Sequence, residues 1–217
     1  MADRQRALVL DFGGVITRTI HETHTQTENA LGIPSGTLTW RGPFDPDTDP
    51  LWVTMQNGEI SERDYYAQRT LEISELIGAG WTEMSQFIRA ARGAEPSAII
   101  RPEALDAIGV AKSQGHKLAI LSNEMDLFYG KDFRGKLSFL DDFDVIVDAS
   151  YSDILKPDAR AYQDCCEQLC TAPEDCVFVD DQRKNITGAS GVGMQVVHFD
   201  VIHPGASYKH ALALLNN

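Results

Sequence analysis

Five short stretches of the chain are apolar almost throughout and are bounded by polar, glycine or proline residues. They are ALVLDF (7–12), KLAILS (117–122), DVIVDA (144–149), CVFVDD (176–181) and QVVHFD (195–200). Their β-branched and apolar character predicts strands. Because most of their apolar positions are continuous and do not alternate, we expect these strands to be covered on both faces, as in a parallel sheet.

Helical patterns separate several of these stretches. PEALDAIGVAKSQG (102–115) and PDARAYQDCCEQL (157–169) each carry a proline near the start, and the first ends at Gly115. These are the start and stop signals of helices. The alternation of strand and helix predicts an α/β fold with a doubly wound parallel sheet.

About 100 residues separate the first strand from the second, far more than a simple crossover needs. SERDYYAQRTLEISELI predicts a helix with Ser61 as its N-cap, and WTEMSQFIRAARG predicts a second helix ending at Gly93. The stretch 32–50 is rich in turn residues and predicts a long loop. We therefore expect a core domain, 1–16 and 97–217, with a helical cap subdomain, 17–96, over the open end of the sheet.

Composition and charge restrict the partners. The chain has 217 residues, is 43% hydrophobic and carries a formal net charge of −13. This charge disfavours nucleic acid and anionic membranes as partners. We expect a small-molecule phosphate substrate and, separately, a monomer or homodimer. No stretch approaches the ~20 apolar residues of a membrane span, and none resembles a signal-peptide core, which predicts a cytoplasmic protein.

Four cysteines without a C-x-x-C pair predict reduced thiols packed on and after a helix. They are Cys165, Cys166, Cys170 and Cys176.

Polar and charged residues follow four of the predicted strands. Ordered along the chain, they are Asp11, then Ser122 and Asn123, then Lys156, then Asp180 and Asp181. Ligands of open α/β sheets bind outside the carboxyl ends of the strands. The sequence therefore predicts a site at this edge of the sheet.

The residue types favour one reaction. Clustered carboxylates repel one another unless a cation lies among them, and hard oxygen ligands suit Mg²⁺. Lys156 adds a positive charge and Ser122 a hydroxyl donor. The glycines that follow Asp11 leave backbone N–H groups open to an anion. Asp11 could then attack phosphorus and form an aspartyl phosphate.

Four segments, LVLDFGGVI, LAILSNE, DILKPDARAYQ and VFVDDQRKNITGA, resemble in order the motifs of the haloacid dehalogenase (HAD) superfamily. The phrase NGEISERDYY resembles the branch with a helical cap inserted after the first motif. The chain is similar to sugar-1-phosphate phosphatase-like and epoxide hydrolase N-terminal phosphatase-like members. The resemblance implies a three-layer, Rossmann-like, five-stranded core and a Mg²⁺-dependent phosphatase acting on a small phosphorylated metabolite, such as a sugar phosphate.

The resemblance also implies roles for single residues. Asp11 would be the nucleophile and a metal ligand, Gly13 would offer its carbonyl to the metal, and Asp181 would be the direct acidic ligand. Asp180 would support Asp181 or hold Lys156, and Asn185 would brace the fourth loop. Ser122 and Lys156 would be catalytic. Phe12, Gly13 and Asn123 would form the phosphate-binding loops.

Gly13 departs from the family pattern, because family phosphatases usually carry a general-acid Asp two residues after the nucleophile. Such a group contributes about 10²–10⁴ in rate. Three explanations are open: a substrate whose leaving group needs little protonation, a proton donor such as His21 or His24 from the cap, or a weak or inactive relative. The alternatives to a phosphatase are therefore a metal-free 2-haloacid dehalogenase-type hydrolase and a HAD-like binding protein.

A few other residues allow two interpretations. Trp40 and Trp52 could line a substrate pocket or pack the cap, and Arg41 could contact substrate or lie in solvent. His198, within an apolar strand, is predicted to be a hydrogen-bonded core residue.

Overall fold

The computed structural model describes residues 5–92 and 96–217, and these form two compact units. The sheet unit comprises Met1–Arg18, Ile99–Asp126 and Arg134–Asn217, and the helical unit comprises Thr19–Ala98 and Leu127–Phe133. The sequence predicted a cap of residues 17–96 and assigned the segment Leu127–Phe133 to the core. In the structure this segment belongs to the helical unit. There the Phe128 ring packs edge-on against Tyr66 at 4.7 Å between centroids.

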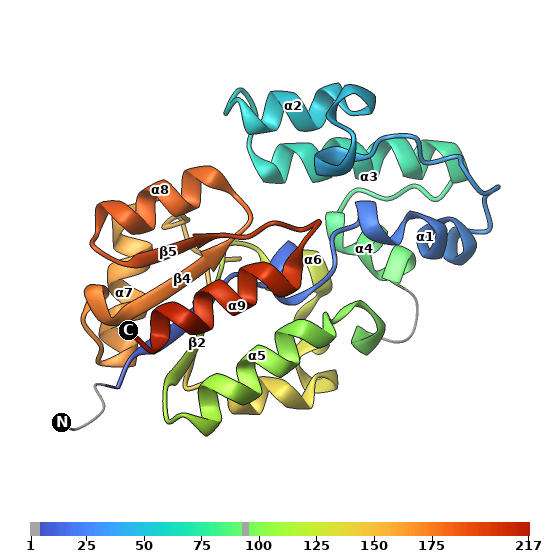
Figure 1. Ribbon diagram of the computed structural model, residues 1–217. Coiled ribbons are helices and arrows are strands. Elements are labelled where there is room, and N and C mark those ends of the chain that lie inside the picture. Colours follow the sequence, from blue (N-terminus) through green and yellow to red (C-terminus); the bar gives the residue numbers. More distant parts are fainter. Residues whose placement is uncertain (1–4, 93–95) are drawn as a thin grey trace. The chain divides into compact units, whose positions relative to one another are not determined.

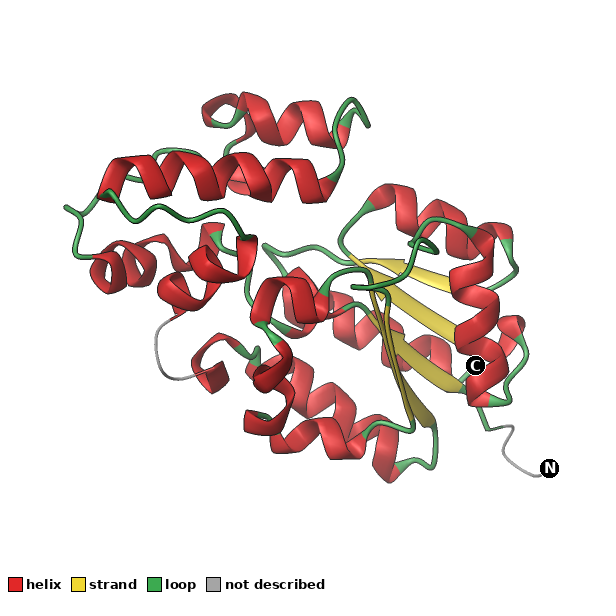
Figure 2. Cartoon of the chain, turned by 180° about the vertical axis from the view of Figure 1, so that it is seen from behind, coloured by secondary structure: helices red, strands yellow, loops and turns green. Residues whose placement is uncertain are grey.

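Within the described residues, the sheet unit contains one five-stranded parallel sheet in the order β3-β2-β1-β4-β5 (Figures 1 and 2). Its strands are β1 (Ala7–Leu10), β2 (Lys117–Ser122), β3 (Val145–Asp148), β4 (Cys176–Asp180) and β5 (Gln195–His198). The predicted α/β fold and all five strands are confirmed. Several strands end one or two residues before the predicted bounds, and Asp11 and Asp181 therefore lie in loops just beyond their strands.

Helices cover both faces of this sheet, which gives the three layers (Figure 1). Contacts place α5 and α9 on one face, and α7 and α8 on the other. These helices are α5 (Pro102–Ser113), α7 (Ala159–Leu169), α8 (Arg183–Gly191) and α9 (Pro204–Leu215). The central strands β1 and β4 are buried throughout, whereas the edge strands β3 and β5 are largely half-buried. Continuous apolar sequence therefore marks the centre of the sheet best.

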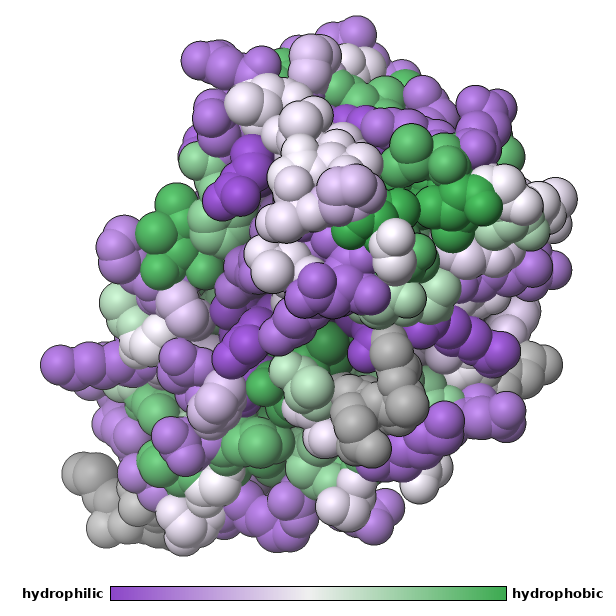
Figure 3. Space-filling view, turned by 90° about the vertical axis from the view of Figure 1, so that its right-hand side faces the viewer, coloured by the Kyte–Doolittle hydropathy of each residue, from purple (hydrophilic) through white to green (hydrophobic). Residues whose placement is uncertain are grey.

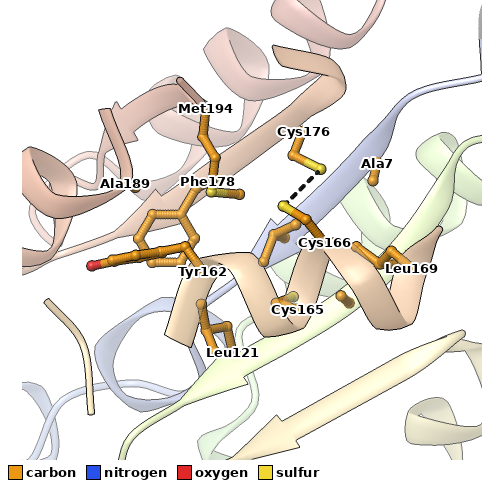
Figure 4. Close-up of a cluster of buried hydrophobic side chains, with 12 residues drawn as sticks. Ala7, Leu121, Tyr162, Cys165, Cys166, Leu169, Cys176, Phe178, Ala189 and Met194 are labelled. Carbon is orange, nitrogen blue, oxygen red and sulfur yellow. Dashed lines mark hydrogen bonds between the residues drawn. The ribbon is translucent and has the colours of Figure 1, made fainter. Parts of the chain in front are cut away.

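Three of the cysteines lie in the core on the α7 side of the sheet (Figure 4). Cys166, on α7, and Cys176, at the start of β4, form a thiol–thiol hydrogen bond with 3.7 Å between their Sγ atoms. All four thiols are reduced, as predicted, but Cys170 is exposed at the end of α7.

The helical unit packs α1 (His24–Leu31) against α4 (Met84–Arg92), and α3 (Glu62–Ile77) against α4 and α2 (Pro50–Gln56). Ser61 caps α3, as predicted, in a reciprocal capping box with Asp64. The predicted end of the second helix at Gly93 lies outside the described residues. The loop predicted at 32–50 contains two short 3₁₀ turns, Gly42–Phe44 and Pro46–Thr48. A further helix, α6 (Met125–Tyr129), spans the boundary of the two units in the sequence.

The face drawn in Figure 3 is a mixture of hydrophilic and hydrophobic side chains, with hydrophilic ones in the majority. None of the helices in the described residues combines the length and the hydropathy that crossing a bilayer requires.

Candidate active site

Asp11 lies directly after β1, in the middle of the sheet, and is 9% exposed. Its backbone N–H extends the ladder to Val179 O on β4 at 2.9 Å. Burial raises the pKa of Asp11 to about 6, and Asp180 adds to this rise, while Lys156 opposes it. At neutral pH the carboxylate is therefore mainly ionised but poorly solvated, which suits a nucleophile.

The Lys156 side chain forms ion pairs with the carboxylates that follow β1 and end β4, Asp11 and Asp180. Its ammonium nitrogen lies 2.8 Å from Asp11 Oδ1 and 2.7 Å from Asp180 Oδ2, and its side chain is 1% exposed. Burial alone would lower the pKa of Lys156, but the two carboxylates outweigh this effect and hold the pKa above its ordinary value. Lys156 is thus a fixed cation inside the acidic cluster.

Neighbouring segments fix the backbone around Lys156. The Asn123 side chain accepts from the Lys156 N–H at 2.7 Å and donates to the Lys156 carbonyl at 3.1 Å. The next residue, Pro157, packs against Gly188 of α8. A Cβ atom at position 188 would lie only 2.7 Å from the Pro157 carbonyl oxygen, so glycine is needed at this position. Asn123 therefore holds the backbone of Lys156, and its predicted place in a phosphate-binding loop stays a prediction.

Asp180 is fully buried, and its carboxylate has several donors. The Gln182 N–H donates at 2.7 Å, and the Asn185 amide donates to both oxygens at 3.1 and 3.0 Å. Together with Lys156, these donors account for both oxygens of Asp180. Asp180 therefore holds the Lys156 ammonium, and Asn185 holds the Asp180 carboxylate.

Asp11, Asp180 and Asp181 each bring one carboxylate oxygen within 4.8 Å of the others. Three hard oxygen donors this close fit a small divalent cation such as Mg²⁺ and disfavour soft-metal chemistry. Since Asp180 is committed to three donors, the direct ligands would come from Asp11 and Asp181.

Ser122 ends β2 and is 5% exposed, and its backbone pairs with Asp148 of β3. Asp148 accepts from the N–H groups of Met125 and Asp126, each at 3.1 Å, and forms an ion pair with Arg134. Asp148 therefore organises the loop after Ser122. The sequence predicted no role for Asp148, because a strand-ending aspartate has no distinctive pattern.

The three residues after Asp11 differ in exposure and in backbone conformation. Phe12 is fully buried, so residue 12 could contact phosphate only through its backbone. Gly13 is exposed, with φ −71°, and a Cβ placed there would meet no atom within 4 Å. Gly14 has φ +77°, a conformation that favours glycine.

His21 and His24 are buried in the helical unit. His21 Nε2 lies 3.0 Å from the Tyr65 hydroxyl, which donates to Asp49 Oδ2 at 2.7 Å. The His24 ring packs edge-on against Trp40 at 4.5 Å. Burial lowers the pKa of both histidines, to about 4 for His24. That either supplies the proton to the leaving group stays a prediction.

The tryptophans, Arg41 and His198, for which the sequence allowed two interpretations, differ in exposure. Trp40 is buried and packs the helical unit, Trp52 is half-buried, and Arg41 is exposed. His198 was predicted to be a hydrogen-bonded core residue: the hydrogen bond is confirmed, but the place in the core is wrong, because His198 is exposed on the edge strand β5. Its ring nitrogen Nε2 lies 3.0 Å from the backbone carbonyl of Asp181.

A family model of haloacid dehalogenase-like hydrolases matches residues 5–193. This chain belongs to that family. It is a HAD-type hydrolase, as the four motifs predicted.

The most similar curated proteins include both dehalogenases and phosphatases. The chain is 28% identical to acyl-CoA dehydrogenase family member 10 of Mus musculus, over 97% of this chain but 19% of that protein. It is 33% identical to (S)-2-haloacid dehalogenase 4A of Burkholderia cepacia, over 92% of this chain and 85% of that protein. It is 25% identical to sesquiterpene phosphatase astK of Aspergillus oryzae, over 89% of both. Two further relatives, a dehalogenase and a phosphatase, are matched over 48% and 46% of their length.

Solved structures share the fold at low identity. A dehalogenase structure aligns with a TM-score of 0.57 and 20% identity over 92% of this chain and 87% of that one. A HAD family enzyme from Bacteroides thetaiotaomicron, solved with magnesium and inorganic phosphate, aligns with a TM-score of 0.54 and 17% identity over 91% of this chain and 95% of that one.

Proposed function

We propose that this chain is a Mg²⁺-dependent phosphatase that hydrolyses a small phosphorylated metabolite, such as a sugar phosphate, through a phospho-aspartyl intermediate on Asp11. The observation that carries the proposal is the cluster in which Asp11, Asp180 and Asp181 bring oxygens within 4.8 Å of one another. Lys156 offsets only one of these three negative charges, so the cluster would still repel an anionic substrate unless a metal cation is bound. A fold neighbour solved with magnesium and phosphate is consistent with this choice of ligand.

The chain's own residues supply the chemistry. The Asp11 carboxylate attacks phosphorus, the bond from phosphorus to the leaving-group oxygen breaks, and water then hydrolyses the aspartyl phosphate to release phosphate and restore Asp11. Lys156 holds the attacking carboxylate at 2.8 Å and neutralises charge on the transferring group. Ser122 donates a hydrogen bond to a phosphoryl oxygen. When bound, Mg²⁺ would supply further charge neutralisation, with Asp11, Asp181 and the Gly13 carbonyl as its ligands.

Gly13 restricts the substrate. With no carboxyl at this position, departure of an alkoxide is unassisted unless another group donates a proton. The proposal therefore favours phosphates with stable leaving groups, such as sugar-1-phosphates, acyl phosphates and aryl phosphates.

A dehalogenase is the second candidate, and the 33% identity to (S)-2-haloacid dehalogenase 4A favours it. In that reaction Asp11 attacks carbon and a halide leaves. The paired acids Asp180 and Asp181 weigh against it, because Lys156 offsets only one of the three negative charges of the cluster and the excess repels the carboxylate of a haloacid.

The test is a phosphate-release screen over phosphorylated metabolites with and without Mg²⁺, run beside a halide-release assay on 2-haloacids. We expect Mg²⁺-dependent phosphate release from the wild type and none from Asp11→Asn. Asp106→Asn is the matched control, since Asp106 is exposed on α5. Halide release without metal would replace the phosphatase by the dehalogenase, and phosphate release by Asp11→Asn would remove Asp11 from its role.

A further inference from the structure

The backbone from Phe12 to Thr17, which follows the proposed nucleophile, is held by hydrogen bonds to its carbonyls. The Thr17 N–H donates to Phe12 O at 3.0 Å, and the Arg101 N–H donates to Ile16 O at 2.9 Å. Gly14 lies between these bonds with φ +77°. A glycine has more backbone conformations available than other residues, so this segment needs contacts from outside to stay in one of them.

Arg101, directly before α5, supplies such a contact. Its side-chain Nε and Nη2 donate to the Gly14 carbonyl at 3.2 and 3.0 Å, and the residue is 3% exposed. Its Cζ atom lies 5.5 Å from the Phe199 ring centroid. Because the guanidinium is planar and stacked, it fixes the direction of the Gly14 carbonyl.

Tyr208 of α9 supplies the next contact. Its hydroxyl donates to the Val15 carbonyl at 3.0 Å, and its ring packs edge-on against Phe199 at 5.2 Å. Phe199 therefore supports both Arg101 and Tyr208. The two side chains therefore hold consecutive carbonyls, those of Gly14 and Val15.

We propose that Arg101 is a positioning residue for the reaction, with Tyr208 as its weaker partner. The two side chains hold the Gly14 and Val15 carbonyls, and so set the direction in which Asp11 and the Gly13 backbone face the substrate. Displacement of a reacting group by about 1 Å can cost about 10²-fold in rate. This inference rests on the proposed function, because the group being positioned is the proposed nucleophile.

The test compares Arg101→Met, Arg101→Lys and Tyr208→Phe with the wild type. Arg6→Met is the matched control, because Arg6 also donates to a backbone carbonyl, that of Leu214, but precedes β1 at the end opposite Asp11. Two measurements are made: hydrogen–deuterium exchange of the peptide covering 11–17, and kcat and KM for an aryl phosphate with Mg²⁺.

We expect Arg101→Met to lower kcat about 10²-fold with little change in KM, and to speed amide exchange in 11–17 but not in 117–122. Arg101→Lys should restore part of kcat, and Tyr208→Phe should lower kcat about 3- to 10-fold, the effect of one hydrogen bond. Arg6→Met should change neither measurement.

The proposal is overturned if Arg101→Met keeps kcat and the exchange of 11–17 within twofold of the wild type. It is also overturned if Arg101→Met only lowers the melting temperature while kcat per folded molecule is unchanged. If Arg101→Met does not fold, Arg101→Lys and Tyr208→Phe decide by the same criteria. If the wild type releases no phosphate from any substrate, the proposed function fails, and exchange alone then decides whether Arg101 holds the loop.

Discussion

Gly13→Asp would place a carboxyl group where family phosphatases usually carry their general acid. The site has room for it, since a Cβ at residue 13 would meet no atom within 4 Å and φ is −71°. The side chain would lie in the exposed part of the loop. We therefore expect the variant to fold as the wild type does.

The expected gain follows from the surroundings of residue 13. The neighbouring carboxylates of Asp11, Asp180 and Asp181 would raise the pKa of the new carboxyl, so that part of it keeps its proton near neutral pH. General acid catalysis contributes about 10²–10⁴ in rate, and an unoptimised group should reach the lower end. We predict a gain of about 10²-fold in kcat/KM, which is about 2.7 kcal/mol, on phosphates with poor leaving groups.

The assay is a series of phosphate monoesters from p-nitrophenyl through phenyl to alkyl phosphates. The wild type should lose activity steeply along this series, whereas Gly13→Asp should rescue the alkyl esters and leave p-nitrophenyl phosphate almost unchanged. Gly13→Asn is the matched control, because its side chain has the same shape but no acidic proton. Equal rates of Gly13→Asp and Gly13→Asn on alkyl phosphates would refute the reasoning, and would indicate that another group already donates the proton.

Three other changes have defined outcomes. Lys156→Met removes the counter-charge of two carboxylates, Asp11 and Asp180, and should lower the free energy of unfolding of the metal-free protein by about 3–5 kcal/mol, measured in urea. Lys112→Met, at an exposed ion pair, should change it little. For His24, whose folded pKa is about 4 against an ordinary 6.5, the unfolded chain binds the proton first as pH falls. Stability of the helical unit should therefore drop by about 3 kcal/mol between pH 6.5 and 4, followed by fluorescence because Trp40, Trp52 and Trp81 all belong to that unit. His24→Gln should flatten this dependence, and an equal slope in the variant would assign it elsewhere. Excess EDTA should stop phosphate release and added Mg²⁺ restore it, while an unchanged rate in EDTA would contradict metal dependence.

Much of the sheet unit could be predicted because its signals are local. Runs such as ALVL and CVFV are apolar throughout because both faces of β1 and β4 are covered. The segment Leu127–Phe133 was misassigned, because its place in the helical unit depends on packing of Phe128 against Tyr66, some 60 residues earlier in the chain.

In the candidate site, too, the residues marked by local sequence patterns could be predicted, and those placed by contacts between distant parts of the chain could not. Strand ends and motif spacing predicted Asp11, Lys156 and Asp180, and the structure brings these three together. The supporting contacts of Arg101 and Asp148 could not be predicted, because an arginine before a proline and an aspartate ending a strand are common in surface positions as well. His198 was misplaced because an edge strand has the same apolar pattern as a central one while one side is open to solvent.

The central claim is that Asp11 becomes phosphorylated within a cation-binding cluster of acids. The most direct measurement is mass spectrometry of the protein quenched in acid after mixing with acetyl phosphate, with Mg²⁺ or with EDTA. The account predicts one phosphoryl group on the peptide containing Asp11, present with Mg²⁺ and absent in EDTA and in Asp11→Asn. Turnover of the phosphate with no phosphorylated Asp11 peptide, or the same modification in the absence of metal, would contradict it.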